Sequence, residues 1–91
     1  MARFGAICTY VNDGDAFRTA KGEWIQLANV CAPDSGEDGY AEAKNILSGL
    51  ILNMKIAYEL VGTSVNPIVA EVWVGEINVN EYMRRKGYIC P

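Results

Sequence analysis

The fold is decided by the stretch Tyr10-Val11-Asn12-Asp13-Gly14-Asp15-Ala16-Phe17-Arg18, in which two apolar, strand-like runs flank an Asp-Gly pair. Glycine supplies the positive φ that a tight reversal needs, and the preceding aspartate can hydrogen-bond the turn backbone. We therefore expect a β-hairpin that reverses at Asp13-Gly14. A second carboxylate, Asp15, leaves the same turn, and two carboxylates so close together could also face one cation. The pattern alone favours a structural turn over a metal site.

The length and composition predict one soluble domain spanning residues 1–91. The chain is 51% hydrophobic, yet it contains no apolar run long enough to cross a membrane, so we expect no membrane partner. Its first residues, Met1-Ala2-Arg3-Phe4, lack the continuous apolar segment of a signal peptide. A cytoplasmic location is therefore expected.

The charged and metal-binding residue types exclude several kinds of site. Eight basic and eleven acidic residues give a net charge of −3, which is the wrong sign for broad phosphate neutralisation and disfavours nucleic acid as a partner. Histidine is absent, which excludes histidine-based triads and histidine metal sites. The three cysteines, Cys8, Cys31 and Cys90, form no Cys-x-x-Cys pair, which argues against a zinc site or a redox motif. We expect core or free thiols.

The pattern of apolar residues predicts a mainly β fold with two helices. Alternating or β-branched runs predict five strands, over Arg3–Val11, Ala16–Thr19, Glu23–Val30, Lys55–Val61 and Ile68–Val74, with a polar loop over Gly62–Pro67. Helical spacing predicts helices near Tyr40–Asn53 and Val79–Lys86, the second begun by a capping-box pattern at Asn78 and Glu81 and closed by Gly87. Five strands with one helix after the third match a small Greek-key barrel of the oligonucleotide/oligosaccharide-binding (OB) type.

Five sequence segments then occur in order along nearly the whole chain. They are Asp13-Gly14-Asp15 after a strand, WIQLANVCAPD over residues 24–34, Ala41-Glu42-Ala43, IVAEVWV over residues 68–74, and Val79-Asn80-Glu81 with Arg85-Lys86-Gly87. Together they resemble the thermonuclease, or staphylococcal-nuclease-like (SNase-like), family. The resemblance implies an OB-fold barrel whose active members are calcium-dependent phosphodiesterases.

The resemblance also implies where calcium would be held and where water would be activated. Active relatives carry an aspartate at the position of Asp15 and an Asp-Thr pair at the positions of Cys31 and Ala32, which help to seat calcium. They carry a glutamate at the position of Asp34, which is assigned to water activation. Only Asp15 is retained, and a thiol is a poor ligand for a cation that takes about six to eight oxygen ligands. Calcium binding is therefore expected to be weak or absent, and no other cofactor is expected.

The phosphate-binding positions of the resemblance have also changed. Two arginines that clamp the phosphate in active relatives fall on Gln26 and Pro67, and neither position retains a cation. Losing one such donor typically lowers the rate by about 10²–10³. The acidic loop residues Glu37 and Asp38 could supply replacement oxygens, although acids before a helix also favour its positive end.

A binding surface can be predicted on the same face. In the third strand Ile25 and Leu27 should face the core, which leaves Trp24 and Gln26 on the outer side. With Asp34, Glu37 and Asp38, this face would be apolar and acidic, which suits a basic protein segment better than a phosphate. The dense cations Arg84-Arg85-Lys86 could contact a phosphate or an acidic partner, or could complement the dipole of the last helix.

These observations predict a catalytically degenerate SNase-like domain that acts as a binding or protein-interaction module. One alternative is a weak calcium-dependent nuclease that uses Asp15, Asp34 and the loop at Glu37-Asp38. Another alternative is a structural protein that self-assembles through an exposed apolar face.

Overall fold

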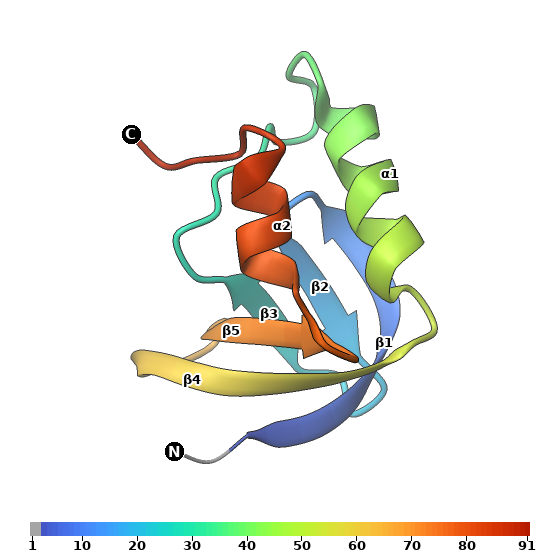
Figure 1. Cartoon of the computed structure of the whole chain (residues 1–91), viewed down its shortest axis with the longest axis vertical. Coiled ribbons are helices and arrows are strands. Elements are labelled where there is room, and N and C mark those ends of the chain that lie inside the picture. Colours follow the sequence, from blue (N-terminus) through green and yellow to red (C-terminus); the bar gives the residue numbers. More distant parts are fainter. Residues whose placement is uncertain (1–2) are drawn as a thin grey trace.

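The computed structural model describes residues 3–91 as a small β-barrel carrying two helices and one short extra strand (Figure 1). The elements are β1 (Phe4–Asp13), β2 (Ala16–Thr19), β3 (Trp24–Leu27), α1 (Tyr40–Ile51), β4 (Lys55–Val65), β5 (Ile68–Val74), β6 (Ile77–Asn78) and α2 (Val79–Arg85).

Five of the strands close into a barrel. β1 pairs antiparallel with β2 along its second half and with β4 along its first half. β4 pairs with β5, and β3 completes the circuit by pairing in parallel with β5, where Gln26 lies opposite Val69. The predicted mainly β, five-stranded OB-type barrel is therefore confirmed. The two-residue strand β6, which pairs with β5, was not predicted because so short a segment shows no alternation.

Three predicted strand ends are wrong, and the smallest of these differences is in β1, which ends at Asp13 rather than Val11. β3 ends at Leu27 rather than Val30, because the chain turns where Asn29 adopts a φ of 58°. β4 continues through part of the predicted polar loop and ends at Val65, which pairs with Ile68 across the hairpin. The serine and threonine in this part of β4 lie in an irregular stretch of the pairing, between Leu60, which pairs with Ala70, and Val65.

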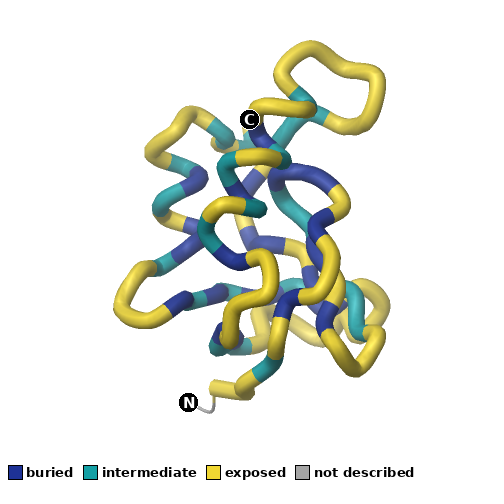
Figure 2. Tube along the Cα trace, turned by 90° about the vertical axis from the view of Figure 1, so that its right-hand side faces the viewer, coloured by how far each residue is buried: buried dark blue, intermediate teal, exposed yellow. Residues whose placement is uncertain are grey.

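The helices lie together at one end of the barrel and cover its core (Figure 1). On α1 the predicted apolar stripe is confirmed, because Ala43, Leu47 and Ile51 are fully buried. Ile25 and Leu27 on β3 also face the core as predicted. Figure 2 shows the buried segments inside, while the turns, parts of β1 and the second half of β4 are exposed. Among residues 3–91, no helix combines the length and the apolar character needed to span a membrane.

The ends of α2 follow their sequence signals. Asn78 Oδ1 accepts a hydrogen bond from the backbone N–H of Glu81 at 2.9 Å, which confirms the N-cap. Gly87 has a φ of 104° and stops the helix, as glycine does in a left-handed position. Arg84 and Arg85 lie in the last turn, where the helix dipole favours cations.

The expectation for the cysteines is confirmed for Cys8 and wrong for the other two. Cys8 is a buried free thiol, whereas Cys31 and Cys90 form a disulfide with their Cα atoms 4.9 Å apart. The C-terminal tail returns to the segment after β3, where the Cys31 N–H donates to the Tyr88 carbonyl at 3.1 Å. This approach joins residues that are 59 positions apart in the sequence, which their spacing did not indicate.

Candidate functional site

The turn between β1 and β2 carries the two aspartates that the sequence singles out. Asp13 is 7% exposed, and its Oδ1 accepts the backbone N–H of Asp15 at 3.1 Å. Its other oxygen accepts from the side-chain amide of Asn12 at 3.3 Å. The predicted hydrogen bond from the aspartate to the turn backbone is therefore confirmed, and both carboxylate oxygens of Asp13 are occupied within the turn.

Gly14 is needed for space and not for its backbone angle. It is not among the glycines with positive φ, so the predicted reason for a glycine in this turn is wrong. A Cβ built on Gly14 would lie 2.6 Å from Cβ of Ala43 and 2.7 Å from Cβ of Ala32. The turn therefore packs directly between α1 and the segment after β3.

We expect Gly14→Ala to lower the free energy of unfolding by about 1–3 kcal/mol, because an added methyl group overpacks this contact. The matched control is Gly49→Ala, at an exposed position in α1 where a Cβ would meet nothing within 4 Å. That change should raise the stability by about 1 kcal/mol through helix propensity. Urea unfolding of both variants checks the pair, and a Gly14→Ala protein as stable as the wild type would contradict the packing.

Asp15 ties the turn to the segment that follows β3. Its Oδ2 accepts the backbone N–H of Ala32 at 3.0 Å, and its carbonyl accepts the N–H of Leu27 at 2.8 Å. Burial raises the pKa of Asp15 from 3.8 to about 7, with further contributions from a hydrogen bond to Asp13 and from the negative charges of Asp13 and Asp34. Partial burial and neighbouring carboxylates thus favour the protonated form of Asp15 more than they would for an exposed aspartate.

This raised pKa predicts a pH-dependent stability. A group with a raised folded pKa contributes stability that is fully present below its unfolded pKa and is lost as the pH rises through about 7. Asp15→Asn stays neutral at every pH, and its amide oxygen can still accept from Ala32. Relative to the wild type, the variant should therefore gain stability between about pH 5 and pH 8. Thermal unfolding at both pH values tests this, and a constant difference between the two proteins would refute it.

The remaining positions of the expected calcium site cannot act as ligands in the expected way. The sulfur of Cys31 is bonded to Cys90, and Ala32 contributes only an N–H that donates to Asp15. Asp34 is exposed and lies near enough to raise the pKa of Asp15. Within residues 3–91 no group of three or more histidine, cysteine or acidic side chains is arranged to hold a metal ion.

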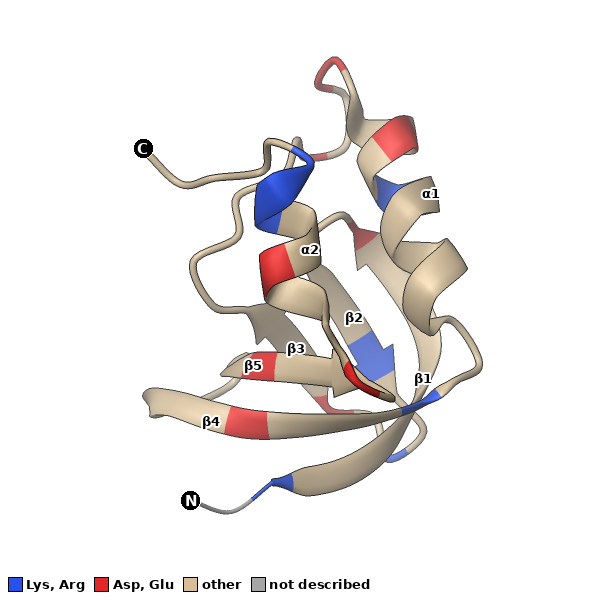
Figure 3. Ribbon diagram, viewed as in Figure 1, with Lys and Arg blue, Asp and Glu red and all other residues tan. Residues whose placement is uncertain are grey.

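In the acidic loop before α1, the side chain of Glu37 forms a hydrogen bond with the backbone of the same loop. One carboxylate oxygen of Glu37 accepts the N–H of Asp34 at 2.7 Å, while the N–H of Glu37 donates to the Asp34 carbonyl at 2.9 Å. Asp38 is exposed in the same loop. Figure 3 shows these acids gathered before α1 and at its start. Glu37 is therefore placed to hold the loop, which agrees with the interpretation as a helix-preceding acidic turn.

The two positions expected to carry the phosphate clamp lie on the outside of the barrel. Gln26 is exposed on β3, between Ala16 of β2 and Val69 of β5. Pro67 is exposed in the turn between β4 and β5. Neither an uncharged amide nor a proline ring can supply a positive charge at these positions.

A row of aromatic and basic side chains runs from α1 across the outer side of strands β1 to β3. This aromatic–cation row consists of Tyr40, Lys44, Tyr10, Trp24 and Arg18, in that order. Lys44 Nζ lies 5.7 Å from the ring centroids of both Tyr40 and Tyr10. The rings of Tyr10 and Trp24 meet edge to face at 6.2 Å, and Arg18 Cζ lies 5.5 Å from the Trp24 ring.

The row confirms one prediction and corrects another. Trp24 lies on the outer side with Gln26, as predicted. The surface around Trp24 is not simply apolar and acidic, because the chain supplies its own cations there through Arg18 and Lys44. The sequence missed these neighbours because the register that places Tyr10, Arg18 and Trp24 side by side follows an irregularity in β1.

The basic cluster at the end of α2 is engaged within the protein. Arg84 forms an ion pair with Glu71 at 3.3 Å, and Arg85 pairs with Glu81 one turn earlier. Lys86 Nζ lies 5.4 Å from the ring centroid of Tyr82. Each of the three cations therefore has an intramolecular partner.

Asn80 was missed as a key residue of this region. It is fully buried, and its Oδ1 accepts the N–H of Val72 at 2.9 Å. Its amide donates to the carbonyls of Ala28 and Ala70, both at 3.0 Å. One side chain thus joins α2 to β5 and to the segment after β3. A polar residue inside an otherwise apolar helical stripe is the signal that could have identified it.

Comparison with known proteins gives no match to this chain, either among protein-family models or among curated proteins.

Proposed function

We propose that this chain is a noncatalytic, SNase-like binding domain and that its partner is a protein segment. The observation that carries the noncatalytic part is the state of Asp15. Its Oδ2 accepts the Ala32 N–H inside the turn, and Ala32 is one of the two positions where the resemblance would place a further calcium ligand, so this contact within the protein stands in place of a ligand set.

The other changes support the same proposal. Calcium sites are built from several oxygen ligands, and a disulfide sulfur at Cys31 cannot replace a carboxylate. Without arginines at Gln26 and Pro67, no side chain at these positions can stabilise the charge that develops on a phosphate during cleavage. The proposed domain therefore has the barrel fold but lacks the residues that phosphodiester hydrolysis would require.

The aromatic–cation row supports a protein partner with acidic residues. The rings of Tyr10 and Trp24 offer apolar contact area, while Arg18 and Lys44 can form ion pairs with carboxylates of a partner. Each exposed ion pair contributes about 0.2–1 kcal/mol, so several contacts are needed together. This replaces the basic segment expected from the sequence, because the cations are already part of this surface.

A single-stranded oligonucleotide is the competing ligand, since bases also stack on aromatic rings. Such binding depends on neutralising many phosphates, and two cations in a chain of net charge −3 provide little of that. The protein segment is therefore preferred.

The test is fluorescence anisotropy with a labelled glutamate-rich peptide containing aromatic and aliphatic residues. A lysine-rich analogue and a labelled oligothymidylate are titrated in parallel. We expect the acidic peptide to bind most tightly, Trp24→Ala to weaken it by about fivefold or more, and Arg18→Met to weaken it by about two- to fivefold. Arg85→Met, whose partner is Glu81, is the matched control and should leave binding unchanged.

Two outcomes would contradict the proposal. One is oligothymidylate binding that is tighter than peptide binding and steeply dependent on salt. The other is peptide binding that Trp24→Ala leaves intact. Sedimentation of the same samples separates peptide binding from self-assembly of the domain.

A further inference from the structure

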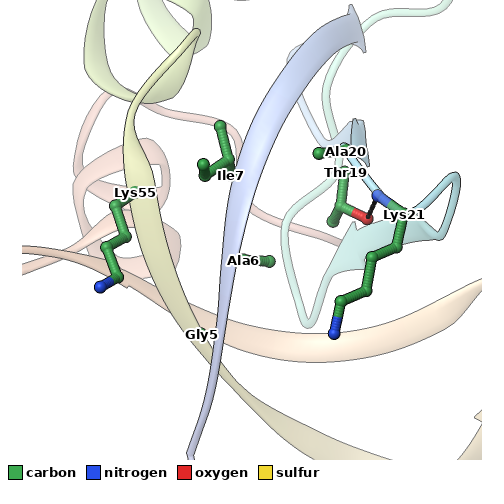
Figure 4. A pocket seen from close by; sticks show the side chains of 7 residues that line it. All are labelled: Gly5, Ala6, Ile7, Thr19, Ala20, Lys21 and Lys55. Atoms are coloured by element: carbon green, nitrogen blue, oxygen red, sulfur yellow. Dashed lines mark hydrogen bonds between the residues drawn. The ribbon is translucent and has the colours of Figure 1, made fainter.

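A hollow of about 300 Å³ lies beside the first half of β1 (Figure 4). It is bounded by Gly5, Ala6 and Ile7 of β1, by the turn that follows β2, and by Lys55 at the start of β4. Its lining is formed mainly by small or aliphatic groups. Nothing in the proposed binding function uses it.

The hollow exists because β1 loses one of its neighbouring strands there. On one side Phe4–Ile7 pair with β4, whereas on the other side β2 ends at Thr19. The last backbone hydrogen bond on that side runs from the Ala20 N–H to the Ile7 carbonyl at 2.9 Å. Beyond it stands Gly5, where a Cβ would meet nothing within 4 Å. The space is therefore built from the strand arrangement and from small residues.

The wall opposite β1 is held in place by a compact turn. The Thr19 hydroxyl accepts the backbone N–H groups of Lys21 and Glu23, both at 3.3 Å. The N–H of Gly22 donates to the Thr19 carbonyl, and the N–H of Thr19 donates to the Glu23 carbonyl, both at 2.9 Å. A ligand would thus meet a preformed wall and would not need to order a loop.

Two lysines give the apolar hollow a cationic rim. Figure 4 shows Lys21 and Lys55 on opposite sides of β1. Within residues 3–91 neither ammonium group forms an ion pair, whereas Arg84 and Arg85 do. Ile7, which lines the hollow between them, is 49% exposed. Apolar surface between two unpaired cations matches an anion that carries an apolar body.

We propose that this hollow binds a short aliphatic carboxylate. The hydrocarbon chain lies against Gly5, Ile7 and Ala20, and the carboxylate meets Lys21 or Lys55 at the rim. The volume is at the lower end of the range for small-molecule sites, about 300–1,000 Å³, which favours a single aliphatic chain such as octanoate over a larger ligand. Each methylene buried in the hollow should strengthen binding by about fourfold.

The experiment is a titration of the whole chain with sodium octanoate, followed by backbone NMR shifts of Gly5 to Ile7 and of Ala20 and Lys21. Butanoate tests the chain length, and octanol tests the charge. We expect octanoate to bind at this site and to bind more tightly than either analogue. Lys21→Met and Lys55→Met should each weaken it by about two- to fivefold. Lys86→Met, next to Tyr82 on α2, is the matched control and should not change it.

Gly5→Val tests the hollow itself, since the added side chain fills the space and valine suits a strand. Octanoate binding should fall by about tenfold or more, because the volume for about two methylenes is lost. Ala20→Leu fills the space from the other wall and should have the same effect. The proposal is overturned if octanoate causes no shifts at these residues, if octanol binds as tightly, or if both filling variants bind octanoate like the wild type.

Discussion

Replacement of both Cys31 and Cys90 by serine should lower the free energy of unfolding by about 4 kcal/mol, the largest effect that we expect from any change in this chain. The bond closes a loop between residues 59 positions apart, and opening it restores the conformational entropy of that loop to the unfolded chain. For a domain of this size the melting temperature should fall by about 15–30 °C. Thermal unfolding by circular dichroism measures this change.

Reductant provides the control for the disulfide. It should bring the wild type to the stability of the double serine variant and should leave that variant unchanged. Cys8→Ala, which removes the buried free thiol but keeps the bond, should remain sensitive to reductant. Reducing compartments keep most thiols reduced. The stability measured with reductant is therefore the one expected in a reducing compartment, and the stability measured without reductant is the one expected in an oxidising compartment. Three titratable thiols in the unreduced, unfolded wild type would contradict the assignment.

Asn80→Ala should cost about 3 kcal/mol, because it removes buried hydrogen bonds and leaves a small cavity. The N–H of Val72, which donates to Asn80 Oδ1, would be left without its partner inside the protein. The carbonyls of Ala28 and Ala70 would each lose one donor. Urea unfolding measures the loss, and the slope with denaturant concentration should stay unchanged if the variant remains two-state.

Asn78→Ala is the matched control for Asn80, since it removes a half-buried amide from the start of the same helix. Loss of its N-cap bond to Glu81 should cost about 1 kcal/mol. Asn80→Asp should be as harmful as Asn80→Ala, because a carboxylate cannot donate to the Ala28 and Ala70 carbonyls. Equal stability of the Asn78 and Asn80 alanine variants would contradict the role of Asn80 as the connection between α2 and the barrel.

Local periodicity was sufficient to predict the barrel. Alternation placed Ile25 and Leu27 inside, and helical spacing placed Ala43, Leu47 and Ile51 inside, because each pattern depends only on residues a few positions apart. The order of the elements then restricted the topology.

Features that depend on distant segments were not predictable in this way. The disulfide requires the tail near Tyr88 to return to Cys31, and no local pattern records that approach. The role of Gly14 likewise depends on Ala32 and Ala43, which reach it only in the folded chain. Both features are consequences of tertiary packing.

The candidate site was predicted in part. The sequence placed Trp24 and Gln26 on the outer face, but it gave no indication that Arg18 and Lys44 would surround the aromatic rings. It also singled out Asp15 as a candidate site carboxylate without indicating that burial and Asp13 would raise its pKa. Charge patterns in space follow from strand register and helix docking, which single residues do not encode.

The central claim is that this domain is a binding module that does not cleave nucleic acid. A nuclease assay across a calcium titration tests this claim most directly. Fluorescence-quenched DNA and RNA oligonucleotides are incubated with the wild type and with Asp15→Asn, from zero to millimolar calcium. We predict that neither protein cleaves either substrate above the rate without protein, and that calcium does not change this. Calcium-dependent turnover by the wild type that Asp15→Asn abolishes would contradict the account.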